Sequence, residues 1–242
     1  MNLNFDYVNH YKADAEEFDY FENRLGATLH DEKRVHEFIM SKVKDNCKSI
    51  LDVGSGSAWV AAEFIPLNKK VFSLDISKTN VVKALKKYPA ENHNGLVADS
   101  FHLPFKDGVY DLVIASEVIE HVISPKVFIE ELYCAVAAGG SLIITTPYKE
   151  VLRYVLCVHC NKKTPVHAHI HSFDEKIFQQ MLNELGIENF EQILFGNKIL
   201  IFLRTYVLLK HLPFSLWKVI DRIANLFYNI PAHFMIVINK KK

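Results

Sequence analysis

Five short apolar runs alternate with stretches of helical pattern through the middle of the chain. The runs are KSILDV (48–53), KVFSLDI (70–76), GLVAD (95–99), YDLVIAS (110–116) and GSLIITTP (140–147), with helical patterns near 58–65, 78–87 and 125–137. Strands that alternate with helices predict βαβ units. Such units form a mainly parallel sheet with helices on both faces. The alternation therefore predicts an α/β, doubly wound domain.

The segments around this region have different patterns. Residues 1–46 are polar, helical in pattern and dotted with aromatics, which predicts an N-terminal helical cap on a domain at 47–242. Within that domain, a Cys/His-rich loop at 148–172 precedes a helix that ends at Gly186, a residue suited to a helix C-terminus. Two last strands, FEQILFGN and HFMIVINK, are separated by an apolar helical insertion at 198–230.

A glycine pair follows the first strand in the stretch LDVGSGSAWV. Gly54 and Gly56 stand two residues apart, and Trp59 occupies the place where a dinucleotide-binding G-x-G-x-x-G turn has its third glycine. Glycines directly after a parallel strand let backbone N–H groups and a helix N-terminus approach a ligand closely. The loop thus predicts a nucleotide-type cofactor, and Trp59 argues against a dinucleotide.

Acidic residues stand at three consecutive strand ends. Asp52 precedes the glycine pair, Asp75 ends the next strand, and Asp99 with Ser100 ends the third. A carboxylate at the position of Asp75 accepts hydrogen bonds from ribose hydroxyls. Asp99 or Ser100 can accept from an adenine amino group, and the ring can lie among Ile76, Leu96 and Phe101. Several carboxylates suit a positively charged adenosine cofactor better than a pyrophosphate.

The motifs ILDVGSGSA, LDIS, ADSFHLPFKDGVYDLVIASEVIEHV and AAGGSLIITTP, in order over roughly residues 45–150, resemble a known family. They resemble class I S-adenosylmethionine-dependent methyltransferases, in the subgroup that contains the ubiquinone and menaquinone biosynthesis enzymes. The resemblance implies a Rossmann-like, seven-stranded, mainly parallel sheet with an antiparallel last strand. It also implies S-adenosylmethionine as cofactor and S-adenosylhomocysteine as product.

The same resemblance assigns a cofactor-binding set. It implies that Asp52 lies near the methionine amino group and that the backbone of Ser116 borders the methyl group. In the family motif D-x-G-x-G-x-G, Ala58 replaces the last glycine. Alanine is a mild replacement where φ is negative, so cofactor binding is expected to survive. The full set is Asp52, Gly54, Ser55, Gly56, Ala58, Asp75, Ile76, Asp99, Ser100, Phe101 and Ser116.

The expected activity is methyl transfer to oxygen, nitrogen or carbon of a small-molecule or lipid-like acceptor. Two alternatives stay open: a metal-assisted RNA 2′-O-methyltransferase, and a non-catalytic S-adenosylmethionine-binding regulatory module with the same fold. Lys plus Arg equals Asp plus Glu at 28 each, so no overall charge favours nucleic acid.

The stretch SEVIEH carries the candidate catalytic residues. Glu117, Glu120 and His121 stand at i, i+3 and i+4, which is one face of a helical turn. His121 is the candidate general base, with Glu117 as a second candidate. In a few relatives, E-x-x-E-H with a later His binds a divalent metal that activates an acceptor hydroxyl. The alternative is that the turn only shapes the pocket.

A second cluster lies in CVHCNKKTPVHAHIHSF. Cys157, Cys160, His169 and His171 have zinc-ligand spacing, with His167 as an alternative ligand. Some relatives of the subgroup carry a similar insert after the fifth strand, and a structural zinc ion is one interpretation. The other is a polar, histidine-lined loop. The two metal hypotheses compete for the same histidines.

The insertion at 198–230 is too charged for a transmembrane helix. Its second half has a narrow polar stripe and is otherwise apolar, which predicts broad burial against the sheet and the N-terminal helices. A hydrophobic acceptor tunnel, a dimer interface and peripheral contact with a membrane are the alternatives. The stripe consists of Ser215, Lys218, Asp221, Arg222, Asn225 and Asn229.

The N-terminal sequence lacks the basic and apolar regions of a signal peptide, and four cysteines do not indicate a disulfide framework. A cytoplasmic location is therefore expected. Aromatic side chains of this region are expected to form a cap over the cofactor cleft, as in relatives. They are Tyr7, Tyr11, Phe18, Tyr20 and Phe21.

Overall fold

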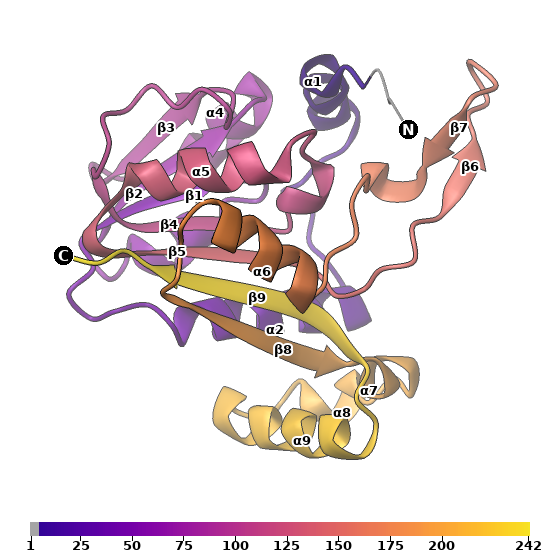
Figure 1. Ribbon diagram of the computed structural model, residues 1–242. Helices are drawn as coiled ribbons and strands as arrows, with labels where there is room; N and C mark the ends of the chain where they lie inside the picture. Colours follow the sequence, from indigo (N-terminus) through magenta and orange to yellow (C-terminus); the bar gives the residue numbers. More distant parts are fainter. Residues whose placement is uncertain (1–4) are drawn as a thin grey trace.

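A seven-stranded sheet runs through the centre of the protein (Figure 1). The computed structural model describes residues 5–242, so the first four residues of the expected cap lie outside it. The strand order is β3-β2-β1-β4-β5-β9-β8, and β9 alone of these seven runs antiparallel to its neighbours. This confirms the predicted fold class. The strands are β1 (Ser49–Val53), β2 (Lys70–Asp75), β3 (His93–Val97), β4 (Tyr110–Ser116), β5 (Val136–Pro147), β8 (Phe190–Asn197) and β9 (Pro231–Asn239).

Helices cover both faces of this sheet, and each face has its own apolar core. Helices α5 (Pro125–Ala135) and α6 (Glu175–Glu184) bury Phe128, Leu132 and Phe178 against one face (Figure 1). On the other face, α2 (Gly26–Met40) and α3 (Trp59–Phe64) bury Phe38 and Phe64. Because both faces are covered, β1 and β4 are buried almost throughout, as strands of parallel sheets are.

Side-chain caps fix where several helices begin. The hydroxyl of Ser77 accepts from the Asn80 backbone N–H at the start of α4 (Lys78–Lys87), and Asp174 accepts from Ile177 N at the start of α6. Gly186 follows α6 with φ of +68°, as expected for a helix C-terminus. The helix α1 (Tyr7–Glu17) begins at Asp6, whose carboxylate accepts from Asn9 N.

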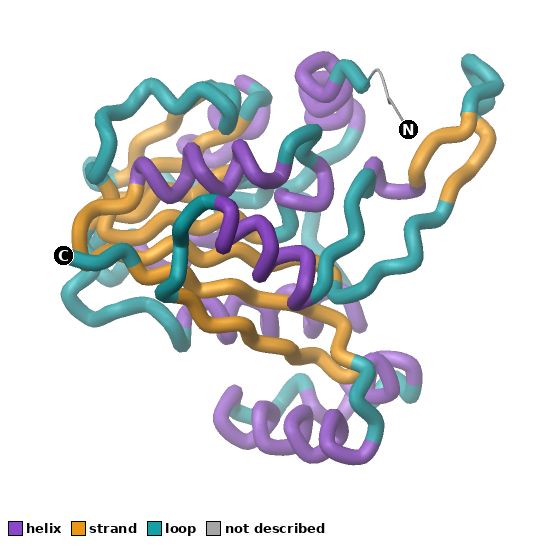
Figure 2. The backbone as a smooth tube through the Cα atoms, in the orientation of Figure 1, coloured by secondary structure: helices purple, strands orange, loops and turns teal. Residues whose placement is uncertain are grey.

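The Cys/His-rich loop contains a small hairpin that the sequence pattern does not indicate. β6 (Tyr154–Leu156) and β7 (Lys163–Pro165) pair antiparallel and project from the body of the protein (Figure 2). A short 3₁₀ turn, η2 (Val166–Ala168), leads from β7 back toward the sheet. Backbone N–H groups of Ile170 and His171 donate to the carbonyl of Glu120, which ties this return segment to the loop after β4.

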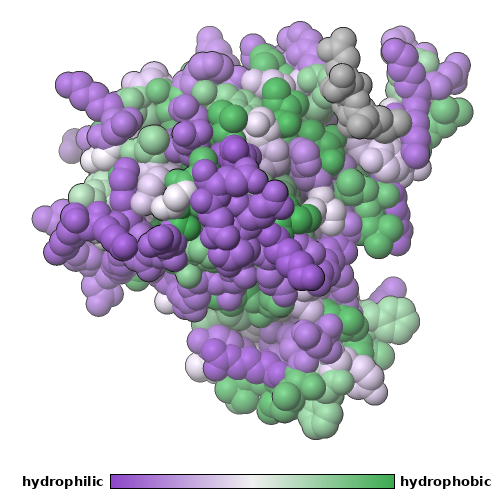
Figure 3. Space-filling model, viewed as in Figure 1, coloured by the Kyte–Doolittle hydropathy of each residue, from purple (hydrophilic) through white to green (hydrophobic). Residues whose placement is uncertain are grey.

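The helical insertion forms α7 (Lys198–Phe202), α8 (Tyr206–Leu209) and α9 (Phe214–Phe227), which pack at the β8 edge of the sheet. The expectation of broad burial is wrong. Asp221 and Trp217 are the buried residues of α9, whereas Leu226 and Phe227 are 81% and 75% exposed. Figure 3 shows apolar side chains gathered on the outside of this segment. No helix among residues 5–242 has the length and hydropathy needed to cross a membrane.

Candidate functional site

A cleft of about 1410 Å³ opens at the carboxyl ends of the parallel strands. Gly54, Asp75 and Asp99 line it from the ends of β1, β2 and β3. Residues of α1 and of the segment after β7 line the opposite side. Ligands of doubly wound sheets bind in this position, outside the strand ends. Four of the five predicted cap aromatics line the cleft (Tyr7, Tyr11, Phe18 and Tyr20), while Phe21 packs against the core instead.

The glycine loop has the conformation that its sequence predicts. Gly54 and Gly56 have φ values of +68° and +44°, in the left-handed region that favours glycine. A Cβ on Gly54 would lie 2.7 Å from Cγ2 of Val118, so no side chain fits there. The N–H groups of Gly54 and Ser55 donate to the Leu74 carbonyl, which holds the loop against β2. The loop therefore presents bare backbone to the cleft.

Ala58 differs from the expectation. Its φ is +58°, so the assumption of a negative φ is wrong, and the residue adopts the left-handed conformation of the glycine that it replaces. The side chain is fully buried beside Val60 and Ala61 and does not line the cleft. Trp59, the next residue, stacks on His36 with ring centroids 3.9 Å apart. Both residues thus serve packing behind the loop.

Asp75 is held in place at the end of β2. Its Oδ1 accepts from Ser77 N at 2.8 Å, and its Oδ2 accepts from Asn80 Nδ2 at 3.3 Å and Gly56 N at 3.4 Å. Burial raises the pKa of this carboxyl, and the three hydrogen bonds oppose that rise. Asn80 also lines the cleft. It is not among the residues predicted from the sequence, although its position in the first turn after a strand-end acid is a usable signal.

Asp99 joins the end of β3 to the N-terminal helix. Its Oδ1 accepts from Phe101 N at 3.0 Å, and its Oδ2 accepts from the Tyr7 hydroxyl. The Tyr7 ring meets Phe101 edge to face, with centroids 5.7 Å apart. Burial and the Asp99 carboxylate raise the pKa of Tyr7 to about 12. Helix α1 thereby closes the cleft over the position predicted for adenine.

Asp52 lies behind the loop instead of lining the cleft. It is 2% exposed, and its Oδ2 has no hydrogen-bond partner within residues 5–242. Burial, with a smaller effect of Asp75, raises the pKa of Asp52 to about 8. Ser55 and Ser116 also lie outside the cleft lining, and the Ser116 hydroxyl is 3.0 Å from that of Thr145. The structure brings the remaining predicted cofactor residues together at the cleft: Gly54, Gly56, Asp75, Ile76, Asp99, Ser100 and Phe101.

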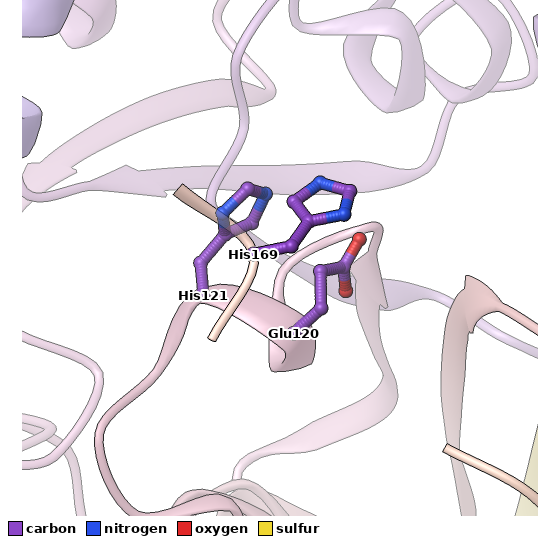
Figure 4. A group of neighbouring side chains, drawn as sticks. All are labelled: Glu120, His121 and His169. Carbon is purple, nitrogen blue, oxygen red and sulfur yellow. The ribbon is translucent and has the colours of Figure 1, made fainter. Parts of the chain in front are cut away.

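Three side chains converge at the far end of the cleft (Figure 4). Ligand-type atoms of Glu120, His121 and His169 all lie within 4.8 Å of one another. Glu120 and His121 come from the 3₁₀ turn η1 (Ile119–His121) after β4, and His169 comes from the segment after β7. The His169 ring nitrogen Nδ1 lies 2.5 Å from Glu150 Oε2.

Some potential metal-ligand atoms of these three residues have no hydrogen-bond partner in the described chain. Glu120 Oε2 accepts from the Thr146 hydroxyl at 3.1 Å, while Oε1 and His121 Nδ1 have no partner in the described chain. Burial raises the pKa of Glu120 well above its usual value and lowers that of His121 to about 3. Two imidazoles and one carboxylate are a donor set that divalent transition metals accept. The residues therefore fit a divalent cation.

Glu117 faces a different neighbour. It has φ of +55° and lines the cleft, and its Oε1 lies 3.9 Å from His233 Nδ1 on β9. The other ring nitrogen of His233 is 3.0 Å from Asp31 Oδ2 on α2. Burial raises the pKa of Glu117, and the neighbouring His233 opposes this. Asp31 and His233 were missed because nothing local in their sequence marks them.

The four predicted zinc ligands do not form one group. Cys157 and Cys160 lie at the turn of the β6–β7 hairpin, and no group of three or more metal-ligand residues in the described chain contains either of them. His171 packs near Phe173 with centroids 5.9 Å apart, and His167 lies at the same distance from His169. Zinc at the hairpin stays a prediction. The histidine that the two hypotheses share, His169, lies with Glu120 and His121.

Comparison with known proteins finds a family match over the residues from β1 to β5. Residues 51–144 match the family described as methyltransferase domain. These residues are similar to methyltransferase domains, and the sheet around them has the fold of solved methyltransferases. The matched residues run from β1 into β5 and include the whole predicted cofactor-binding set.

The curated relatives also match less than half of this chain. Ubiquinone biosynthesis O-methyltransferase of Rickettsia prowazekii is 34% identical over 119 residues, or 46% of each chain. Norajmaline N-methyltransferase of Rauvolfia serpentina is 30% identical over 102 residues, or 40% of this chain and 35% of its own. Phosphoethanolamine N-methyltransferase 2 of Haemonchus contortus, solved with S-adenosylmethionine, is 15% identical with a TM-score of 0.56 over 87% of this chain and 53% of its own, which shows a shared fold.

The match to methyltransferase domains covers the strand ends at the cleft, and residues after 144 lie outside it. This chain spans less than half the length of the curated relatives it matches, between 38% and 46% of the first three. His169, the β6–β7 hairpin and the helical insertion follow residue 144. The family match therefore covers Gly54, Asp75 and Asp99 at the strand ends, and it does not cover the segment after β7 that also lines the cleft.

Proposed function

We propose that the protein transfers a methyl group from S-adenosylmethionine to a small-molecule or lipid-like acceptor. The observation that carries this proposal is Asp75, a buried carboxylate fixed at the end of β2 beside two side-chain-free glycines. The family match supports the reaction class, and relatives named for ubiquinone biosynthesis and for norajmaline support a small acceptor. A cytoplasmic location remains a prediction.

The cofactor supplies a methyl group on a positively charged sulfur, and this chain's residues bind and orient it. Asp75 would accept hydrogen bonds from the ribose hydroxyls, and Asp99 and Phe101 would hold the adenine. The bare backbone at Gly54 and Gly56 would leave room for the methionine portion. Positioning of this kind supplies much of the rate enhancement of a group transfer. His121, the candidate base, lines the cleft with an unpartnered Nδ1. Because burial lowers its pKa to about 3, it accepts a hydrogen bond from an acceptor hydroxyl or amine more readily than a full proton.

The test replaces Asp75 by Asn, which keeps the shape and removes the charge. Hydrogen bonds to a charged group contribute about 1.5–3 kcal/mol, so we expect calorimetry to show S-adenosylmethionine affinity at least about tenfold weaker. Asp107→Asn, an exposed acid before β4, is the matched control and leaves affinity unchanged. Full affinity in Asp75→Asn contradicts the assignment. Binding without turnover across a broad acceptor panel favours a regulatory module instead.

A second candidate is methylation of a hydroxyl oriented by a metal ion, which the convergence of Glu120, His121 and His169 favours. We propose that these residues hold a divalent cation beside the acceptor position. A bound cation polarises a hydroxyl and lowers its pKa. An RNA 2′-hydroxyl is one acceptor of this class, and the balanced net charge argues for smaller ones. In this alternative His121 is a ligand and is not the base.

Calorimetric titration with Mg²⁺, Mn²⁺ and Zn²⁺ tests the metal. We expect His169→Ala to weaken binding of the preferred cation by at least about tenfold, since it removes one of three ligands. His167→Ala, its neighbour, is the control. Binding that disappears in Cys157→Ser and persists in His169→Ala assigns the metal to the hairpin and contradicts this site. Salt-dependent binding to RNA ends favours the nucleic-acid acceptor.

A further inference from the structure

The helix α9 faces the protein with its polar side. Asp221 is buried, and its carboxylate accepts from Gly196 N at 3.1 Å and Asn197 N at 2.7 Å at the end of β8. The Asn197 amide donates to Asn225 at 2.9 Å, also on α9. These contacts fix the rotation of the helix. Two residues of the polar stripe, Asp221 and Asn225, therefore attach the helix to the sheet, and most of its apolar side faces outward.

A second polar attachment holds the turn before α9. Arg34 on α2 is 1% exposed and donates to the carbonyls of Leu209 and Leu212, and its guanidinium lies 5.0 Å from the Trp217 ring centroid. Buried hydrogen bonds to a charged group are costly to break. The orientation of the insertion is thus set at both ends by polar contacts.

The outward apolar face consists of Leu216, Val219, Ile223, Leu226 and Phe227, all of which are between 47% and 81% exposed. Phe202 and Leu208, in α7 and α8, are 84% and 77% exposed beside it. Figure 3 shows these apolar surfaces at the α9 end of the molecule. Contiguous exposed apolar surface of this kind marks an interaction site.

The charges around the outward apolar face are of one sign. Residues 198–230 contain five Lys or Arg residues and a single acid, Asp221, which is buried. Arg204, Lys210 and Arg222 are exposed. The chain as a whole has a net charge of zero, so this end is locally basic. A helix with an apolar face, interfacial aromatics and flanking cations is suited to an anionic lipid surface.

A second copy of the chain fits this surface less well. A two-fold interface brings the same patch together on both copies. Arg222 lies beside the outward apolar face, between Val219 and Ile223 in the sequence, so it would meet cations of the other copy with no exposed acid from this segment to pair with. Like charges in an interface oppose association.

We propose that the outward apolar face of α9 binds the surface of an anionic phospholipid bilayer, with Arg204, Lys210 and Arg222 at the headgroups. The start of α2 links this surface to the cleft. Gly26 lies against Tyr206 of α8, and Asp31 and Glu32 on the same helix line the cleft. Docking therefore brings the cleft near the bilayer, where lipid-like acceptors dissolve. The binding itself does not depend on the proposed methyl transfer.

Flotation with phospholipid vesicles tests the proposal on the full chain. We expect binding to vesicles of equal parts phosphatidylcholine and phosphatidylglycerol, weaker binding to phosphatidylcholine alone, and loss at high salt. The double variant Leu226→Ser, Phe227→Ser removes two exposed apolar side chains and lowers partitioning at least about tenfold. Arg222→Glu lowers partitioning about fivefold or more on anionic vesicles only.

Leu67→Ser, which alters a 57% exposed leucine in the turn after α3, is the matched control and keeps full binding. Thermal unfolding and S-adenosylmethionine affinity, measured on every variant, show that the fold and the cofactor site are intact. Absence of vesicle binding at low salt, or full binding by the double variant, overturns the proposal. So does a dimer in light scattering that the double variant abolishes without any vesicle binding.

Discussion

At the glycine loop, one methyl group occupies a backbone conformation that glycine usually fills. Ala58 has φ of +58° and is completely buried. The left-handed conformation costs an alanine about 1–2 kcal/mol. Burial of the methyl group stabilises the folded state by about 0.8 kcal/mol. A glycine here would cost about 0.5–1 kcal/mol more in chain entropy on folding. These contributions nearly cancel, which explains why alanine is tolerated at this position.

We therefore expect Ala58→Gly to leave the free energy of unfolding within about 1 kcal/mol of the original protein. Ala61 is the matched comparison, since it is equally buried in the same core but lies inside α3 with a right-handed backbone. Ala61→Gly loses the methyl burial and helix propensity with no relief of strain, so it destabilises by about 1–2 kcal/mol. Urea denaturation measures both, and equal losses contradict the argument.

Much of the cofactor side of the cleft could be predicted because its signals are local. Glycines after a strand and acids at strand ends meet at one edge of any parallel sheet, and Asp75 and Asp99 lie where this rule places them. The sign of φ at Ala58 could not be predicted, since an alanine in the sequence does not show whether its backbone is right-handed or left-handed. Asp31 and His233 come from a distant helix and from the last strand, and only the tertiary fold brings them to Glu117.

Among the elements, α9 is attached to the end of β8 through a buried carboxylate. Asp221→Ala leaves the N–H groups of Gly196 and Asn197 without their acceptor, and each buried unpaired group costs about 1–3 kcal/mol. We expect a loss of about 2–4 kcal/mol in the free energy of unfolding. The control is the exposed neighbour in Arg222→Ala, with a change within about 0.5 kcal/mol. Equal stability of the two variants in urea would show that α9 is attached by other contacts.

The sequence pattern predicts neither the orientation of α9 nor the strands β6 and β7. The periodicity of α9 correctly indicates two faces, but a period carries no information on which face meets the protein. The apolar face is larger, yet the open N–H groups at the end of β8 need a polar partner, and this need decides the orientation. The strands β6 and β7 are three residues each, too short for any alternation to be recognised.

For the molecule as a whole, the buried Asp52 makes stability depend on pH. Its pKa is raised to about 8 in the folded protein from 3.8 in the unfolded chain, so the folded state binds more protons between those values. The free energy of unfolding therefore falls as pH rises from about 4 to 8, by an amount on the order of a few kcal/mol from this group. In Asp52→Asn this contribution is absent. Urea denaturation between about pH 5 and 8 compares the two proteins, and parallel curves contradict the prediction.

The place of β9 in the sheet has a consequence for synthesis. β9 pairs with β5 on one side and β8 on the other, although it follows both along the chain. Because the chain is made from its N-terminus, both strands present open edges until β9 emerges. Unpaired edges are templates for pairing with other chains. Before β9 is made, the β9-facing edges of β5 and β8 are therefore both unpaired in the nascent protein. Aggregation through strand pairing is most favourable at this stage, so chaperone binding is most useful then.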